Sequence, residues 1–186
     1  MDRREAIRSI SLLLGGTVVG GTYFLTGCRA NETTTLTFTK DDVAFLDEVA
    51  DTILPDTETP GAKAAKVGEF MTVMVNDCYE KEDQEIFHKG IKQLNDVSTK
   101  KYGKGFMKLT PAQRTEMLVA LDQEQKDFQK NKKPEERSHY FRMMKELTLL
   151  GYFTSEIGCT QARRYVERPG SYNGCLPYKK GDKAWA

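Results

Sequence analysis

Residues 39–62, TKDDVAFLDEVADTILPDTETPGA, contain the pattern that decides the fold. Thr39 stands three residues before Asp42, an arrangement that resembles a capping box with Asp in place of Glu and predicts a helix start. The apolar residues that follow at helical spacing are Val43, Leu46, Val49, Ala50, Ile53 and Leu54. Pro55 ends this helix, and the residues up to Ala62 are turn formers, because proline fixes φ and glycine permits positive φ. The stretch therefore predicts a helix followed by a tight loop.

The chain after this loop repeats the combination of helical spacing and turn residues. Thr110-Pro111 is its clearest helix start, since threonine caps a helix and proline suits the first helical position. Further helices are expected over residues 64–79 and 81–101, from Pro111 to the break at Asn131, and over residues 135–152 and 155–165. The residues expected to face inward include Cys78, Val97, Phe128 and Leu150. No alternating strand pattern appears, so the sequence predicts an all-α fold, a compact bundle of about five to six helices.

Both ends of the domain differ from its helical part. Residues 166–186 are rich in turn formers and lack periodicity, so we expect an irregular, extended C-terminal tail. Residues 28–38 read as a polar tether. The expected division is therefore a single helical domain over residues 39–186, with the tether before it and the tail as its last part.

The N-terminus, MDRREAIRSISLLLGGTVVGGTYFLTGCRA, has the layout of a secretory signal. A charged stretch with Arg3 and Arg4 precedes an uncharged run over residues 10–27. A membrane span needs roughly 17–25 apolar residues, but the glycine pairs at 15–16 and 20–21 make this run a poor permanent helix. Arg3-Arg4 resembles a twin-arginine signal, which is an address read by a receptor and not an anchor.

Leu25-Thr26-Gly27-Cys28 resembles a bacterial lipobox, in which a peptidase cuts just before a lipidated cysteine. The alternative is a short N-terminal helix with an incidental cysteine, but the order of paired arginines, apolar run and lipobox favours the signal. We therefore expect residues 1–27 to be removed and Cys28 to carry acyl chains, each buried CH₂ contributing about 0.8 kcal/mol. The mature protein would then be a lipoprotein of the bacterial cell envelope, facing the periplasm and attached to a membrane without spanning it.

The composition of the mature chain is that of one ordinary soluble domain. Removing 27 of the 186 residues leaves 159. The whole chain has a net charge of +1, and the removed segment has three arginines against Asp2 and Glu5, so the mature chain is near neutrality. No basic patch indicates a nucleic-acid partner, and no acidic tail indicates a cationic one.

The sequence yields no candidate for catalysis, for cofactor binding or for metal binding. His88 and His139 are the only histidines, and neither is followed by a metal-ligand partner three or four residues later. The motifs Cys-x-x-Cys, Gly-x-Gly-x-x-Gly and Gly-x-Ser-x-Gly do not occur. Acidic pairs such as Glu135/Glu136 are better explained as first-turn residues that favour the helix dipole. We therefore expect a chain that binds no cofactor of its own.

Three cysteines remain after lipidation, namely Cys78, Cys159 and Cys175. Disulfides form in the oxidising compartment expected here, and an odd number leaves one thiol over. A Cys159–Cys175 bridge within the chain, a bridge to another subunit, and buried unpaired thiols all remain open.

The methionine and aromatic residues each have two interpretations. The pairs Met71/Met74 and Met143/Met144 lie in apolar stripes, where core packing is the default and a docking face the alternative. Aromatic residues gather toward the C-terminus with arginines, which is typical of interfaces; a tail folded back over its own helices is the other interpretation. These residues are Tyr152, Phe153, Tyr165, Tyr172, Tyr178 and Trp185, with Arg163, Arg164 and Arg168.

Three segments together resemble one known family. ADTILPDTETPGA at residues 50–62 is similar to its first helix-and-loop motif, GYFTSEIG at 151–158 to its late motif, and Tyr165 with PGSYNGC at 169–175 to its closing motif. The family is gluconate 2-dehydrogenase subunit 3, the small subunits of membrane-associated FAD-dependent sugar and aldonate dehydrogenases. The resemblance spans nearly the whole chain. A twin-arginine leader is typical of the family, whereas the lipobox distinguishes this chain from members without lipid.

The resemblance implies a non-catalytic accessory subunit of an oxidoreductase complex. Its partner would be a large GMC-type subunit that binds FAD, with a cytochrome c subunit as a further candidate. The small subunit would supply the export signal and aid assembly and membrane attachment. The candidate contacts with a partner are Tyr152, Phe153, Tyr165, Tyr172 and Cys175. A free-standing membrane-anchored lipoprotein that binds a ligand or acts as a scaffold is the alternative.

Overall fold

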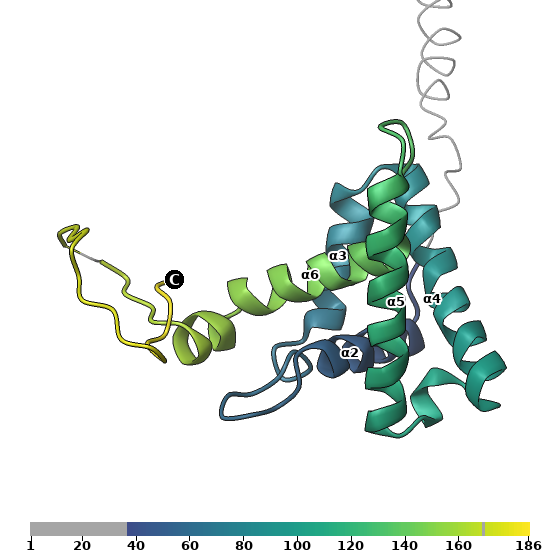
Figure 1. Ribbon diagram of the computed structural model, residues 1–186, viewed down its shortest axis with the longest axis horizontal. Coiled ribbons are helices and arrows are strands. Elements are labelled where there is room, and N and C mark those ends of the chain that lie inside the picture. The colour runs from purple at the N-terminus through teal and green to yellow at the C-terminus, as the bar shows by residue number, and fades with distance from the viewer. Residues whose placement is uncertain (1–36, 169) are drawn as a thin grey trace, which may run out of the picture. The chain divides into compact units, whose positions relative to one another are not determined.

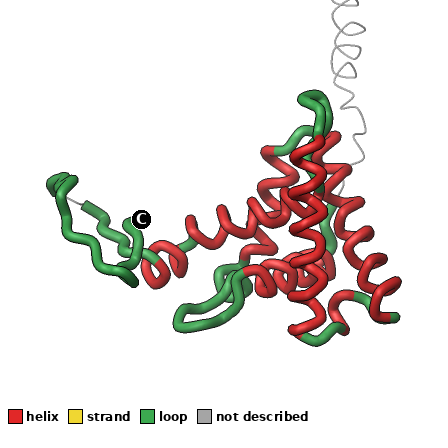
Figure 2. Tube along the Cα trace, in the orientation of Figure 1, coloured by secondary structure: helices red, strands yellow, loops and turns green. Residues whose placement is uncertain are grey.

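Every regular element of the computed structural model is helical across the residues that it describes, 37–168 and 170–186. In chain order the elements are α2 (Lys40–Ile53), α3 (Val67–Cys78), α4 (Lys81–Tyr102), the short 3-10 turn η1 (Phe106–Lys108), α5 (Pro111–Asn131), α6 (Tyr140–Thr154) and the π-helical turn η2 (Gly158–Ala162) (Figure 1). Figure 2 shows only helix and loop in this part of the chain, which confirms the all-α class predicted from the sequence. None of the helices described is long and apolar enough to cross a membrane.

Two helices begin at the threonines that the sequence marks as caps. At the start of α2, Thr39 Oγ1 accepts a hydrogen bond from Asp42 N at 3.2 Å, and Asp42 Oδ2 accepts one from Thr39 N at 2.9 Å. Thr110 and Gln113 form the same reciprocal pair at the start of α5, with Pro111 in the first turn. Each pair satisfies two amide groups that a helix start would otherwise leave without partners. Both capping predictions are confirmed.

The second helix starts later than its periodicity predicts. α3 begins at Val67 and not near residue 64, because residues 62–66 form tight turns that end at Lys66. Lys66 has a φ of 54°, in the left-handed region that residues other than glycine seldom occupy. Alanine and lysine are good helix formers, so the sequence gives no local sign of this turn.

The fifth predicted helix is also shorter at its start. α6 begins at Tyr140 and is capped by the ring of His139, so Glu135 and Glu136 lie in the preceding loop. Their predicted place in a first helical turn is wrong. Glu136 instead accepts a hydrogen bond from Lys133 N at 3.1 Å and so closes a turn within that loop.

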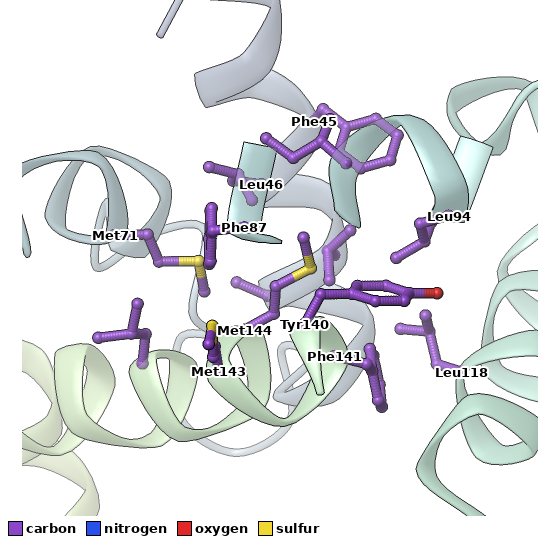
Figure 3. Packing of buried hydrophobic residues seen from close by; sticks show 14 of the residues in the cluster. Phe45, Leu46, Met71, Phe87, Leu94, Leu118, Tyr140, Phe141, Met143 and Met144 are labelled. Atoms are coloured by element: carbon purple, nitrogen blue, oxygen red, sulfur yellow. The ribbon is translucent and has the colours of Figure 1, made fainter. Parts of the chain in front are cut away.

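α6 is the central helix of the bundle, because it packs against α2, α3, α4 and α5. Figure 3 shows Met143 and Met144 of α6 close to Met71 and Phe87 from neighbouring helices. These four side chains are at most 4% exposed, and Met74 is half-buried. Burying a side chain of this size contributes about 1.5–3 kcal/mol relative to leaving it in water. The methionines of α6 are therefore core residues and not a docking face.

Two glycines let α6 approach its neighbours closely. A Cβ on Gly90 of α4 would lie 2.5 Å from Tyr140 Cβ, and one on Gly151 of α6 would lie 2.6 Å from Phe70 Cδ1. Carbon atoms make favourable contact only at about 3.5–4.0 Å, so neither position has room for a side chain. The spacing of the helices around α6 therefore depends on these two glycines.

Four residues that were expected to face inward are on the surface. Val97, Phe128 and Leu150 are 36%, 39% and 46% exposed, and Cys78 is exposed at the end of α3. Val97 and Phe128 line an open groove beside the start of α6, which the neighbouring helices leave uncovered. The apolar stripes of α4 and α5 thus continue beyond the buried core.

Phe38 belongs to the bundle and not to the tether. Its ring stacks on His88 with the centroids 4.0 Å apart, and it meets Phe87 edge-on at 6.0 Å. The packed domain therefore includes Phe38, which the sequence assigned to the tether.

Candidate partner-binding surface

Two of the three motif segments quoted above meet in space through Tyr152. Its hydroxyl donates a hydrogen bond to Pro60 O at 2.8 Å and lies 3.4 Å from Thr59 Oγ1. The side chain is 5% exposed, and its ring packs edge-on against Phe153 with the centroids 5.2 Å apart. The prediction that Tyr152 contacts a partner is wrong, because this side chain lies inside the domain and fixes the loop at residues 55–62 to α6.

The loop at residues 55–62 is held by its own backbone and by Asp56. Asp56 Oδ1 accepts a hydrogen bond from Gly61 N, and Leu54 O accepts one from Ala62 N at 2.9 Å. A Cβ on Gly61 would lie 2.7 Å from Asp56 N, so the turn requires glycine here. The first motif is therefore explained by the structure of a tight turn.

After α6 the chain turns sharply into η2. Ser155 Oγ donates a hydrogen bond to Tyr152 O at 2.7 Å and accepts one from Gly158 N at 3.0 Å. A Cβ on Gly158 would lie 1.9 Å from Tyr152 O, so this second turn also depends on glycine. The helix predicted over residues 155–165 is present only at residues 156–162, the last five of which form η2, and the backbone is extended at Arg163.

Residues 163–186, which we name the C-terminal loop, present their large apolar side chains to solvent. The exposed fractions are 55% for Tyr165, 41% for Val166, 96% for Tyr172, 49% for Leu176, 74% for Tyr178 and 55% for Trp185. A group of exposed apolar side chains on a soluble protein commonly marks an interaction site. Tyrosine, tryptophan and arginine are also the residue types enriched at the energetic centres of interfaces.

The two ends of the C-terminal loop are joined by contacts that we name the Arg164–Trp185 clasp. Arg164 N donates a hydrogen bond to Ala184 O at 2.8 Å, and Ala186 N donates one to Arg164 O at 3.1 Å. Arg164 Nε donates to Lys183 O at 2.7 Å, and the guanidinium lies over the Trp185 ring, 4.4 Å from its centroid. Figure 1 shows the end of the chain, in yellow, returning to the start of the loop beside η2. The loop is therefore closed at its base.

The remaining candidate contacts have different environments. Phe153 is half-buried, and the Arg163 guanidinium covers its ring at 4.7 Å from the centroid. Tyr165, Tyr172 and Cys175 are exposed on the C-terminal loop, as an interface role requires. From the sequence, the arginines and Trp185 could be assigned to a candidate interface only because of their residue types. Nothing in the sequence indicated that Arg164 and Trp185 touch, since no periodic pattern joins residues so far apart in an irregular segment.

The C-terminal loop is basic, whereas the helical part of the domain is acidic. Residues 163–186 contain six basic and two acidic residues, a formal charge of +4, and residues 39–162 contain 18 basic and 22 acidic residues, a formal charge of −4. Within the part of the chain described here, no ion pair joins any of the six basic side chains to a carboxylate. No carboxylate of the described residues therefore neutralises this charge by an ion pair, although Arg163 and Arg164 also contact aromatic rings of the chain.

The cysteines of the described residues are free thiols. Cys159 is half-buried and donates a hydrogen bond to Phe153 O at 3.2 Å, while Cys175 is exposed. The structure therefore has no Cys159–Cys175 bridge. Cys78 and Cys175 are also not the buried unpaired thiols that the sequence left open, because both are exposed, and a bridge from one cysteine to another subunit stays a prediction.

The open groove beside the start of α6 has a volume of about 690 Å³, and its lining includes His139 together with Phe128 and Val97. His139 Nδ1 accepts a hydrogen bond from Phe141 N at 3.2 Å, and burial lowers the pKa of His139 although nearby Glu124 opposes this. Nδ1 of His139 thus caps α6. We interpret His139 as a structural residue.

Cys28, Arg3 and Arg4 lie outside the residues that the structure describes. Lipidation at Cys28 and the twin-arginine signal therefore stay predictions. Across residues 37–168 and 170–186, no group of three or more His, Cys, Asp or Glu side chains is placed to hold a metal ion.

A family model described as Gluconate 2-dehydrogenase subunit 3 matches residues 40–170 of the chain. The matched stretch runs from the first residue of α2 into the C-terminal loop and includes the motif segments at 50–62 and 151–158. No curated protein and no solved structure matches the chain.

Proposed function

The chain belongs to the gluconate 2-dehydrogenase subunit 3 family, and on this basis we propose that it is the accessory subunit of a periplasmic FAD-dependent dehydrogenase that oxidises gluconate or a related sugar. The family match over residues 40–170 is the observation that carries the proposal. The large subunit, a GMC-type flavoprotein, holds FAD and the catalytic residues, and this chain contributes neither. A cytochrome c subunit is the further partner that we propose as the electron acceptor.

The C-terminal loop is the surface that we propose for contact with the large subunit. Tyr172 is 96% exposed and Tyr165 is 55% exposed, so both can bury a ring in a partner without first leaving the core. Tyrosine loses little conformational entropy for the area that it buries, which suits it to such a contact. Phe153 and Cys175, at the base and within the loop, complete the proposed contact surface.

The second part of the proposal concerns export and attachment. Arg3-Arg4 would direct a folded complex out of the cytoplasm, and Cys28 would then hold it at the membrane through acyl chains. The order of paired arginines, weakly apolar run and lipobox supports this role. A large subunit without its own signal would then be exported by association with this chain.

Purification of the tagged protein from membranes under mild conditions tests the accessory role. A flavoprotein with bound FAD that oxidises gluconate or a related sugar, with a dye as electron acceptor, should co-purify. Deletion of this chain should abolish that dye-linked oxidation at the membrane. If no flavoprotein co-purifies and the oxidation survives deletion, the accessory role is wrong and a free-standing lipoprotein becomes the better interpretation.

The contact surface is tested by a matched pair of variants. Tyr172→Ser should lose the flavoprotein during purification, whereas Val119→Ser, which changes a 64% exposed side chain on α5, should retain it. Equal retention by both variants would show that the large subunit binds elsewhere.

The twin-arginine signal and the lipidation of Cys28 are tested by separate variants. Replacing Arg3 and Arg4 together by lysine should leave this chain, and any partner without a signal, in the cytoplasm; normal export of both would refute the twin-arginine assignment. Cys28→Ala should abolish labelling by a lipid probe, and continued labelling would refute the lipobox.

A further inference from the structure

We propose that the C-terminal loop is a preformed docking element for an acidic, partly apolar surface of the large subunit, and that the Arg164–Trp185 clasp holds the loop in its binding conformation. The inference rests on the accessory-subunit function proposed above. It adds the chemistry of the partner surface and the contacts that prepare the loop for binding.

The first step concerns the conformation of the loop before binding. The described residues of this 24-residue segment form no helix or strand, and such a segment would ordinarily lose much conformational freedom on docking, which weakens affinity. The clasp removes part of this freedom in advance, because it joins the loop ends through two backbone hydrogen bonds, one side-chain hydrogen bond and a cation–π contact. Preorganisation of this kind raises affinity without adding contacts to the partner.

A second turn inside the loop adds to this restraint. Asp182 Oδ2 accepts a hydrogen bond from Lys179 N at 2.9 Å, and Asp182 N donates one to Lys179 O at 3.0 Å. Gly181 supplies a φ of 97° within this turn, a value that few other residues tolerate. The segment that leads into the clasp is therefore itself ordered.

The second step concerns the chemistry of the partner. The loop presents exposed tyrosines and aliphatic side chains between the two sides of the clasp, and residues 163–186 as a whole carry a formal charge of +4. An acidic surface with apolar hollows complements both properties, and attraction between opposite charges raises the rate of encounter at low salt. The helical part of this chain is also acidic, so a second copy is the competing occupant.

The clasp can be tested in the chain alone, because Trp185 is its only tryptophan. In the chain purified from membranes and separated from any co-purifying subunit, Arg164→Ala should make Trp185 more accessible to acrylamide quenching of its fluorescence and lower its fluorescence anisotropy. Arg168→Ala removes the same charge from the same loop and should leave both signals unchanged. If Arg164→Ala also leaves them unchanged, the clasp does not order the loop and the proposal is overturned, whatever the partner does.

Affinity for the flavoprotein that co-purifies in the experiment above tests the docking role. We expect Arg164→Ala to raise Kd about tenfold more than Arg168→Ala does, and Trp185→Leu to raise it similarly. Raising salt from about 0.05 to 0.5 M should slow association of the wild type about tenfold, since the Debye length falls below 10 Å.

Three results would overturn the proposal at this stage. If Arg164→Ala and Arg168→Ala raise Kd equally, the loss of positive charge explains both effects and the clasp has no role in affinity. Association that does not depend on salt would exclude an acidic partner surface. A dimer of this chain that disappears in Tyr172→Ser would assign the loop to a second copy. Failure of any flavoprotein to co-purify would refute the proposed function, whereas the quenching measurement still decides the clasp by itself.

Discussion

Tyr152→Phe is the substitution that separates the structural role of Tyr152 from a role in binding. It removes one hydroxyl and keeps the ring, which is 5% exposed and packs against Phe153. The hydroxyl donates to Pro60 O at 2.8 Å, across 92 residues of sequence. The variant therefore loses the hydrogen bond to Pro60 O and the longer contact of 3.4 Å with Thr59 Oγ1, and it keeps the packing of the ring.

The expected loss of stability comes mainly from the hydrogen bond between the Tyr152 hydroxyl and Pro60 O. A hydrogen bond between neutral groups contributes about 0.5–1.5 kcal/mol net. Pro60 is half-buried, so water can donate to its carbonyl oxygen in place of the lost hydroxyl and offset part of the cost. We therefore expect the free energy of unfolding to fall by about 1 kcal/mol. With a urea dependence of about 2 kcal/mol per molar, the midpoint of unfolding should shift down by about 0.5 M. The melting temperature should fall by about 3 °C.

Urea unfolding followed by far-ultraviolet circular dichroism measures this shift, and Tyr165→Phe is its matched control. Tyr165 is 55% exposed on the C-terminal loop, so removing its hydroxyl should leave the unfolding midpoint unchanged. Tyr152→Phe should bind the flavoprotein as tightly as the wild type. A Tyr152→Phe variant with wild-type stability and weakened binding would refute the assignment of Tyr152 to the interior.

Three further predictions concern the bundle. Burial lowers the pKa of His139 below 6.5, so the stability that its neutral ring contributes is present above pH 6.5 and is lost as the pH falls below that value. His139→Asn can cap α6 without titrating, so this variant should lose less stability than the wild type between pH 7 and 5. Parallel profiles of stability against pH for the two proteins would contradict this. Gly90→Val should destabilise by about 1–3 kcal/mol or more, because its Cβ would lie 2.5 Å from Tyr140 Cβ, and a wild-type melting temperature would disprove the close approach. Thr110→Ala should cost about 1 kcal/mol in urea unfolding through loss of its cap, and an unchanged midpoint would show that the cap contributes little.

Much of the fold could be predicted because its signals are local. Thr39 and Thr110 each bind an amide group three residues later, so their sequence context is sufficient to place two helix starts. Lys66 and His139 are different. Lys66 adopts a left-handed conformation without being glycine, and His139 caps α6 although it is not a typical cap residue, so composition misplaces the starts of α3 and α6.

For the candidate site, the sequence predicts only which residue types take part and not which of them are exposed. Tyr152, Tyr165 and Tyr172 belong to the same aromatic group in the sequence, yet Tyr152 is buried and the other two are exposed. Their difference depends on Pro60, far away in the chain, which receives the hydroxyl of Tyr152 alone. The contact between Arg164 and Trp185 likewise joins distant residues of an irregular segment, where periodicity carries no information.

The central place of α6 also determines when the fold can be completed during synthesis. α2, α3, α4 and α5 all pack against α6, yet it is the last long helix to leave the ribosome. The four earlier helices therefore wait, with their apolar faces incompletely covered, until residue 154 has been made. The export address that we propose at residues 1–27 is synthesised first, long before there is a closed domain for it to carry. A transport route that accepts only folded cargo would thus act on this chain after translation and not during it.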